Sequence, residues 1–469
     1  MQCARRFPWP AVFTVIEPRA EPGRGIAFSA AHPAHRLNAP HAAHVIDPEE
    51  GDDFWQWVER TGTLARDPLA MHADGTSYIQ RGTFGEYIRE QFERTRVRNP
   101  SDSEIRHIAS HTIDIEESSP GLVVTLETGE RLNADMVVVA TGNEPPAPLR
   151  EFQSAVESHP AYVADPWAGN AIERIHPNDK VLLIGSALTA ADVAASLLAN
   201  GHRGPIDSVS RTGLLPARRP RPQSEQPALT NAELSSMAWD RISRPNTLFV
   251  EKHGELDRVS QICRALRAEI KDSEKLGLPW HGPFDDLRDS VRAVWPRLEN
   301  KEKQRFLRHL RRWYDAHRFR LPPQLEQVLD KAVATGQLSY VTARIQSANI
   351  EGEKLQVDLL ERTTRRSTSQ VYSYVINCTG PSGRPHLSTS PFIHALLASG
   401  LCRTHPTGLG FDVDHDCRAF NAAGQRVPSL VFLGALTLGA FGEPLATPWI
   451  AAQIWRMVPG LVAQLQSSA

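Results

Sequence analysis

Apolar residues form continuous runs in some segments of the chain and recur at helical spacing in others. The change from one pattern to the other is clearest around residue 185. Residues 181–184 are four consecutive apolar side chains, which is typical of a strand buried in a parallel sheet. Residues 188–198 carry apolar side chains at helical spacing. Gly185 stands between the two segments, where its conformational freedom permits a tight turn. The pattern predicts a strand, a glycine turn and a helix whose first-turn N–H groups can bind phosphate oxygens.

A similar order of strands occurs twice. In each copy, apolar strand segments end at a Thr-Gly pair, which is Thr141 and Gly142 in the first copy and Thr379 and Gly380 in the second. One such pair follows many buried strands, but two in the same context indicate an internal duplication. Small residues there allow the backbone to approach a second nucleotide. The predicted strand segments are residues 104–115, 122–126 and 136–139, and residues 340–350, 355–360 and 372–376.

The glycine turn matches a dinucleotide-binding fingerprint only in part. The fingerprint G-x-G-x-x-G/A falls on Gly185, Ala187 and Ala190, of which only the first is strict. An ordinary strand-to-helix turn is the alternative interpretation. The next predicted strand ends in Ser210 and Arg211, where an NAD site usually has an acid. A hydroxyl and a guanidinium suit a 2′-phosphate, so NADPH is favoured over NADH.

The first copy lacks a counterpart of this unit. Residues 12–16 alternate as a short strand and end at Glu17, an acid that suits an adenosine ribose. A dinucleotide fold needs on the order of 25 to 30 residues before such a strand, whereas residues 1–11 precede it here. Either the first domain is incomplete or Glu17 is an ordinary strand end.

At 469 residues, the chain exceeds what one hydrophobic core usually supports. The predicted fold class is α/β, with two Rossmann-like dinucleotide-binding domains, β-meander excursions and a mostly helical insertion. The first domain lacks its opening strand and glycine turn. The predicted boundaries are residues 1–150 and 381–469 for the first domain, 151–220 and 336–380 for the second, and 221–335 for the insertion.

The insertion combines helical periodicity with a basic stretch interleaved with aromatic residues. A solvated basic face of an amphipathic helix is favoured over an anion or nucleic-acid site. The end of the stretch, residues 317–323, is the part expected to line a pocket. The predicted helices are residues 257–276, 283–294, 302–317 and 323–334, and the arginines are Arg305, Arg308, Arg311, Arg312, Arg318 and Arg320.

The last apolar strand, residues 430–433, is followed by Gly434, a glycine-rich turn to Glu443 and a predicted helix from Pro448. An ending of this kind can point helix N–H groups at an electron-rich ring. Such groups stabilise the negative charge of a reduced flavin.

Charge and cysteine content narrow the functional classes. The 52 Lys and Arg residues balance 54 Asp and Glu residues, which gives no global field for nucleic acid or an anionic membrane. Five widely spaced cysteines without a C-x-x-C pair indicate a reducing compartment and argue against a dithiol–disulfide reductase. No apolar run has transmembrane length, and Pro8 and Pro10 interrupt the N-terminus, so a cytoplasmic protein is expected.

No metal site is predicted, because the histidines of residues 32–44 lie in a proline-interrupted loop without the compact spacing of zinc ligands. A polar loop or a lining beside a flavin is favoured. The histidines are His32, His35, His41 and His44.

Taken together, these segments resemble the FAD/NAD(P)-binding family that includes FAD-dependent urate hydroxylases, and more distantly the flavin monooxygenases and N-hydroxylases. The resemblance spans most of the chain. It rests on EPRAEPGRGIAFS, HRLNAP, VVVATGNEPP, VLLIGSALTAAD, GHRGPIDSVSRTGLLP, FLRHLRRWYDAHRFRLPP and VINCTGP.

The resemblance implies a role for several groups of residues. Glu17 would meet the FAD ribose, the loop of Arg24 and Gly25 would lie along FAD, and Thr141 and Gly142 would border the cofactors. NAD(P)H would be held by Gly185, Ser186, Ala187, Leu188 and Thr189. The family opens with a strand and G-x-G-x-x-G for the FAD pyrophosphate, and this opening is absent here. One hypothesis is that the true start of translation lies upstream of Met1.

The sequence therefore predicts an FAD- and NAD(P)H-dependent oxidoreductase, a monooxygenase that uses molecular oxygen on a small polar substrate. The oligomeric state stays open. Alternatives are a non-catalytic nucleotide-binding protein that has lost FAD, and a flavin reductase that passes electrons to a partner. Asn38, Arg384 and Glu443 are candidates near the flavin ring, each with an ordinary structural role as the alternative. No general base is assigned.

Overall fold

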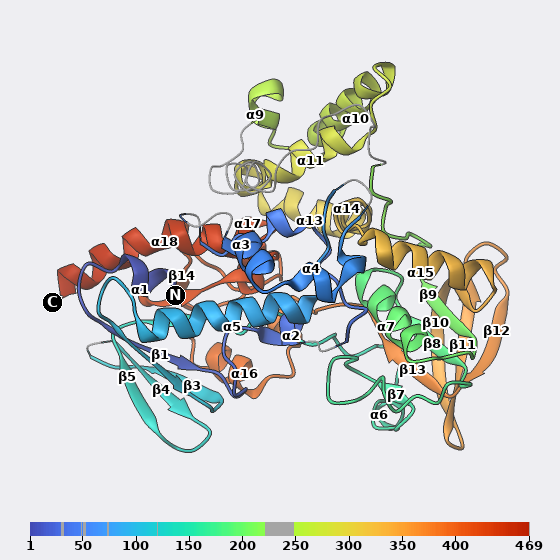
Figure 1. Cartoon of the computed structure of the whole chain (residues 1–469), viewed down its shortest axis with the longest axis horizontal. Helices are drawn as coiled ribbons and strands as arrows, with labels where there is room; N and C mark the ends of the chain where they lie inside the picture. The colour runs from blue at the N-terminus through green and yellow to red at the C-terminus, as the bar shows by residue number, and fades with distance from the viewer. Residues whose placement is uncertain are drawn as a thin grey trace.

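The computed structural model describes residues 1–29, 32–47, 49, 53–72, 75–119, 121–220 and 248–468. Two α/β lobes lie side by side, and a group of helices projects from between them (Figure 1). The first lobe contains residues 1–144 and 385–468, the second lobe residues 154–214 and 323–377, and the helical projection residues 248–318. Residues 221–247 of the predicted insertion lie outside the described residues.

A seven-stranded sheet forms the second lobe, in the order β12-β11-β10-β9-β8-β13-β7. Strands β7, β13, β8, β9 and β10 are parallel, and β10, β11 and β12 form an antiparallel meander. All four residues of β8 are buried, as expected for a central parallel strand. The strands are β7 Tyr162–Val163, β8 Val181–Ile184, β9 Ile206–Ser210, β10 Leu338–Glu351, β11 Lys354–Glu361, β12 Ser367–Tyr372 and β13 Tyr374–Asn377.

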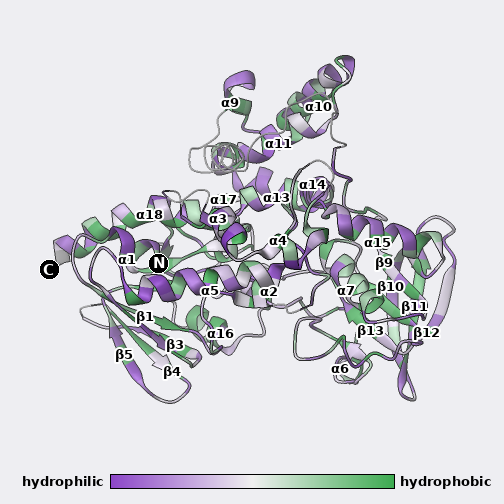
Figure 2. Ribbon diagram, in the orientation of Figure 1, coloured by the Kyte–Doolittle hydropathy of each residue, from purple (hydrophilic) through white to green (hydrophobic). Residues whose placement is uncertain are grey.

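Two helices cover one face of this sheet. The apolar side of α7 (Leu188–Ala199) and of α15 (Pro323–Ala334) packs on the parallel strands in one core. Figure 2 shows the same distribution, with hydrophobic residues along α7 and the strands beside it. The short helix α6 (Ser154–Glu157) lies near β7 in Figure 1 and contacts β10.

The first lobe contains three smaller sheets. Strand β1 pairs in parallel with β2, and β6 pairs in parallel with β15, which pairs on its other side with β14. A third sheet is the antiparallel meander β3-β4-β5. Apolar residues of β1, β2, β6 and β15 join one core with helix α16. The strands and helix are β1 Val12–Ile16, β2 Glu104–Ile108, β3 Thr112–Glu117, β4 Leu122–Leu126, β5 Arg131–Ala134, β6 Val137–Val139, β14 Arg418–Phe420, β15 Arg426–Phe432 and α16 Pro391–Ala398.

The remaining helices of the first lobe surround these sheets. Helix α2 packs directly on α5, because a Cβ atom at Gly85 would overlap the carbonyl oxygen of Phe28. Helix α1 contacts the long C-terminal helix α18. The elements are α1 Gln2–Arg6, α2 Gly25–Ser29, η1 His41–Ala43, α3 Asp53–Arg60, α4 Thr63–Arg66, η3 Pro68–Ala70, α5 Arg81–Val97, η5 Pro385–Leu387, η6 Gly434–Thr437, α17 Leu438–Phe441 and α18 Thr447–Ser468.

The helical projection has a core of its own, built around Phe249, Ile262, Leu287 and Trp295. Trp295 also donates its indole N–H to the carbonyl of Gly439 in the first lobe (2.8 Å). The elements are α9 Leu248–His253, α10 Val259–Lys275, α11 His281–Asp289, α12 Val291–Val294, η4 Trp295–Arg297, α13 Asn300–His309 and α14 Arg311–Arg318.

The structure confirms the predicted α/β class with β-meanders and a helical insertion, and it corrects several details. The predicted strand at 104–115 is two strands, β2 and β3, separated at the buried Ser110. The predicted helix at 302–317 is interrupted at Leu310. Residues 22–29, which the sequence predicts to be irregular, include helix α2. Strands β5 and β12 were not predicted. Among the described helices, none combines the length and apolar character needed to cross a membrane.

Candidate cofactor-binding site

The carboxyl ends of β8 and β13 lie side by side at the centre of the parallel sheet. The chain leaves β8 through α7 towards β9 on one side, while β13 lies on the other, so this is the topological switch point where open α/β sheets bind ligands. Gly185 follows β8 with φ +130°. A Cβ atom at Gly185 would overlap the carbonyl oxygen of Cys378 beside it. Glycine is therefore required by both conformation and space.

The amino end of α7 is open above this turn. Ala187 is the N-cap residue, and no side chain caps the helix. Ala187 is exposed, and Ser186, Leu188 and Thr189 are half-buried, so the turn is partly accessible to solvent. The first-turn N–H groups have no intrahelical acceptor, and together with the helix dipole they favour an anion. The predicted pyrophosphate contacts thus lie together at one helix end.

The loop after β9 approaches the same turn. The hydroxyl of Ser186 donates to the carbonyl of Leu214 in this loop (2.8 Å). The hydroxyl of Ser210 accepts the N–H of Gly213 (3.1 Å), which has φ +69°. These contacts fix the loop and leave the Arg211 side chain exposed beside the glycine turn.

The glycines of the two Thr-Gly pairs have the same φ angle, and the pairs lie on adjoining segments. Gly142 and Gly380 both have φ +81°, and Thr141 and Thr379 are exposed. The chain segments that follow the pairs meet where Ser382 N–H donates to Pro145 C=O (3.3 Å). In addition, the side-chain amide of Asn377 donates to Ala147 C=O (3.2 Å). Both crossings between the lobes therefore run next to each other.

The predicted FAD-side residues lie in the first lobe. Glu17 follows β1, and its carboxylate accepts hydrogen bonds from the backbone N–H of Arg19 (3.1 Å) and from its guanidinium (3.2 Å). Arg24 forms an ion pair with Glu21 (2.5 Å) and donates to Phe28 C=O (3.2 Å), just before Gly25 opens α2. Arg24 also donates to Gly82 C=O in α5 (3.4 Å), and this contact holds the Arg24 and Gly25 loop against α5.

Asn38 and Gly434, two further predicted residues, each use a backbone group in a hydrogen bond within the protein. The carbonyl of Asn38 accepts a hydrogen bond from Arg219, which leads from the second lobe towards the insertion. Gly434 is buried with φ +62°, and its N–H donates to the side chain of Gln453 in α18 (2.9 Å). The Gly434 N–H is thus already hydrogen-bonded within the first lobe.

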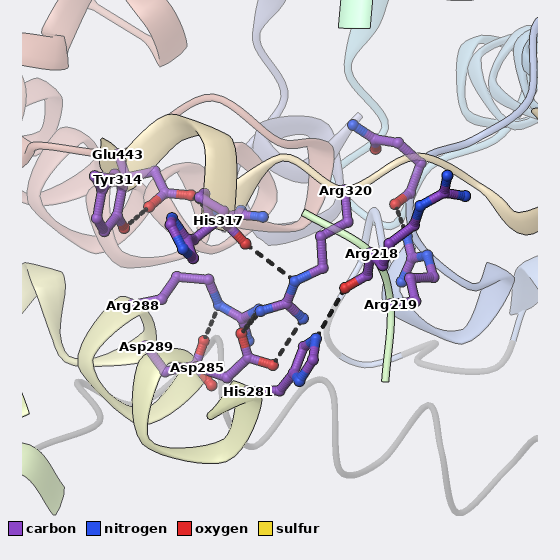
Figure 3. Close-up of polar contacts among 12 residues, drawn as sticks. Arg218, Arg219, His281, Asp285, Arg288, Asp289, Tyr314, His317, Arg320 and Glu443 are labelled. Carbon is purple, nitrogen blue, oxygen red and sulfur yellow. Dashed lines mark hydrogen bonds and ion pairs between the residues drawn. The ribbon is translucent and has the colours of Figure 1, made fainter. Parts of the chain in front are cut away.

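A buried polar network joins the helical projection to the first lobe, and the sequence analysis did not predict it. At its centre, Tyr314 and Arg318 of α14 both donate to Glu443, and Figure 3 shows the contact between Tyr314 and Glu443. Burial raises the pKa of Tyr314 well above its usual value, and the Glu443 charge adds to this effect. The hydroxyl therefore stays protonated and acts as a donor. Glu443, which the sequence places near the flavin ring, accepts hydrogen bonds from these two side chains of the helical projection.

The same network continues within α11. Asp285 accepts hydrogen bonds from Arg320 (2.8 Å) and Arg288 (3.0 Å), and Arg288 also pairs with Asp289 (2.8 Å) (Figure 3). Burial raises the pKa of Asp285, but the charges of Arg288 and Arg320 outweigh it, so this pKa lies below its usual value. The acid–arginine spacing at 285 and 288, three residues apart on a helix, is the signal that could have indicated part of this network.

The four loop histidines have different polar partners, and the rings of His32 and His35 also contact each other (5.4 Å between centroids). His35 hydrogen-bonds the hydroxyl of Ser196 (2.7 Å), and His32 contacts the side chain of Asn200 (3.1 Å). The ring of His41 contacts Trp55, and His44 Nδ1 donates to Pro40 C=O (3.1 Å). Burial lowers the pKa of His44 to about 4, so its ring is neutral at physiological pH.

Residues 3–144 match the model of a family described as FAD-NAD(P)-binding. The match covers less than half of the chain. No curated protein sequence matches the chain. Among solved structures, the chain is similar to the ornithine N-hydroxylase of Kutzneria sp. 744, with reduced FAD, NADP+ and L-ornithine (TM-score 0.61, 14% identity, 98% of this chain and 99% of that chain).

Two further solved structures have the same architecture. They are the reduced ornithine hydroxylase of Pseudomonas aeruginosa (TM-score 0.60, 13% identity, 97% of this chain and 99% of that chain) and the FAD-bound cadaverine monooxygenase of Erwinia amylovora (TM-score 0.55, 13% identity, 96% and 94%). Identities this low show a shared fold.

These comparisons confirm the predicted resemblance and the two-nucleotide flavoprotein fold, and they agree with the predicted pair of cofactors, FAD and NAD(P)H. The matched stretch, residues 3–144, contains Glu17, Arg24, Gly25, Asn38, Thr141 and Gly142. The individual contacts of these residues, and the predicted domain boundaries, stay predictions.

Proposed function

We propose that this protein is an FAD-dependent oxidoreductase that uses NADPH, and that it is a monooxygenase acting with molecular oxygen on a small polar substrate. The observation that carries the proposal is the hydrogen bond between Ser382 and Pro145. It holds the segments after both Thr-Gly pairs together, so two nucleotides bound to the two lobes would bring their reactive rings to one junction.

The second lobe fits NADPH. The open first turn of α7 would bind the pyrophosphate, and the absence of a side chain at Gly185 lets the phosphates approach the backbone closely. Arg211, held at the end of β9, would bind the 2′-phosphate. Thr379 and Gly380 would border the nicotinamide end, because they follow the neighbouring strand β13.

The first lobe fits the adenosine and ring ends of FAD. The Glu17 side chain is 20% exposed at the carboxyl end of β1, where it would accept hydrogen bonds from the ribose hydroxyls. Thr141 and Gly142 would lie beside the ring. When bound, the flavin would accept a hydride from NADPH and reduce dioxygen. The chain would hold the two cofactors, orient them and keep water from the junction.

A second candidate is a nucleotide-binding protein without flavin. One observation favours it. Among the described residues, strand β1 has β2 as its single pairing partner, and strand β6 has β15. Between these strands, the described residues supply no counterpart of the Gly185 turn for a second pyrophosphate.

The visible absorption spectrum of the purified protein, with and without added FAD, tests the proposal. We expect flavin bands that bleach when NADPH is added without oxygen and return when oxygen is admitted. A colourless protein that binds NADP+ but neither retains FAD nor oxidises NADPH would contradict the proposal and support the second candidate. Bleaching without reoxidation by oxygen would indicate a reductase with a protein partner.

A further inference from the structure

Helix α14 of the projection lies against the loop that follows β9. The N–H of Ala217 in this loop donates to the carbonyl of Ala316 in α14 (2.7 Å). Arg312 is one helical turn before Ala316, so both residues share the face of α14 directed at the loop. The same loop begins at Arg211 and is tied to the glycine turn by Ser186.

Arg312 and Arg211 influence each other electrostatically. Burial lowers the pKa of Arg312, and the positive charge of Arg211 lowers it further. Within the described part of the chain, neither guanidinium has a recorded hydrogen bond or ion pair. Two like charges held near each other without a counterion are unfavourable, and an anion between them would remove the repulsion.

The neighbouring arginines behave differently. Arg311 pairs with Asp315 (2.7 Å), Arg318 donates to Glu443, and Arg320 pairs with Asp285 (2.8 Å). The basic stretch is thus mostly neutralised within the protein. Arg312 differs from these three because its helix contacts the cofactor loop and it pairs with no acid among the described residues.

We propose that Arg312 and Arg211 together bind the 2′-phosphate of NADPH, one guanidinium from the helical projection and one from the parallel sheet. This inference rests on the proposed function. A phosphate dianion accepts two bidentate guanidinium contacts, and each arginine offers a planar pair of N–H donors. The helical projection would therefore contribute to cofactor specificity, and bound NADPH would bridge it to the second lobe.

Calorimetric titration of the full chain with adenosine 2′,5′-bisphosphate and with 5′-AMP tests this assignment without flavin or turnover. We expect the wild type to bind the bisphosphate more tightly. Arg312→Gln should weaken bisphosphate binding about tenfold, as expected for one charge-assisted contact, and leave 5′-AMP binding unchanged. Arg308→Gln on α13 is the matched control, because Arg308 is exposed and its substitution removes the same charge.

The pattern of results separates the two proposals. Unchanged bisphosphate binding in Arg312→Gln, together with loss in Arg211→Gln, would overturn the role of Arg312 and leave NADPH binding intact. Equal binding of both nucleotides by the wild type would contradict NADPH as the cofactor and the two-arginine site with it. Arg312→Lys keeps the charge and should retain part of the preference for the bisphosphate over 5′-AMP. A weakened 5′-AMP affinity in Arg312→Gln would show that the substitution disturbs the structure, and this would contradict a specific contact with the 2′-phosphate.

Discussion

Arg81 of α5 and Asp192 of α7 form a 2.8 Å ion pair between the two lobes. The Asp192 side chain is only 3% exposed and the Arg81 side chain 16%. A buried carboxylate that loses its partner keeps its desolvation cost without compensation. The pair therefore holds the glycine-turn helix of one lobe against helix α5 of the other.

We predict that Arg81→Ala lowers the free energy of unfolding by about 3 kcal/mol or more. Chemical denaturation followed by circular dichroism measures this loss. Arg60→Ala is the matched control, because Arg60 pairs with Glu90 at the surface and both side chains are exposed, so a loss below about 1 kcal/mol is expected. Equal losses in the two variants would contradict the role of the buried pair.

Gly185→Ala should abolish tight binding of NADP+, because the new methyl group would overlap the carbonyl of Cys378 and the backbone has φ +130°. We expect the dissociation constant to rise at least about tenfold, since displacement of the turn moves the α7 amides away from the pyrophosphate. Gly282→Ala is the control, because an added Cβ there meets nothing within 4 Å. Unchanged binding in a folded Gly185→Ala variant would exclude this turn as the site.

Arg211→Asp should change the preferred nicotinamide cofactor. An acid at the end of β9 repels a 2′-phosphate and can accept hydrogen bonds from a ribose 2′-hydroxyl. The ratio of kcat/KM for NADPH to that for NADH should fall at least about tenfold with added FAD. A ratio equal to that of the wild type would show that Arg211 does not contact the phosphate.

His44 should make stability depend on pH. Its pKa is lowered from 6.5 to about 4 by burial, so the unfolded chain takes up a proton at higher pH than the folded chain does. The free energy of unfolding should therefore fall as pH decreases from 6.5 to 4, by about 3 kcal/mol for this residue. His44→Gln should remove that part of the dependence in denaturation measured across this range. His415→Gln, at a side chain 86% exposed, is the control and should leave the slope unchanged.

The regular elements could be predicted closely where a local pattern sufficed. Helix α15 and strand β4 have the predicted bounds, because a proline begins the first and alternating burial marks the second. Strand β12 was missed, since its residues are mostly polar and it is a strand only by pairing with β11. The break between α13 and α14 at Leu310 was also missed, because helical periodicity continues through it.

The amino-acid sequence alone determined that a buried strand breaks at Gly185 into a helix, and that two halves end in Thr-Gly, since both features depend on residues adjacent in the chain. Tertiary structure alone decided which charges stay unpaired. Arg318 and Arg320 meet acids more than thirty residues away along the chain, while Arg312 lies on a helix that contacts the loop beginning at Arg211. Long-range packing brings these groups together, and no local spacing encodes it.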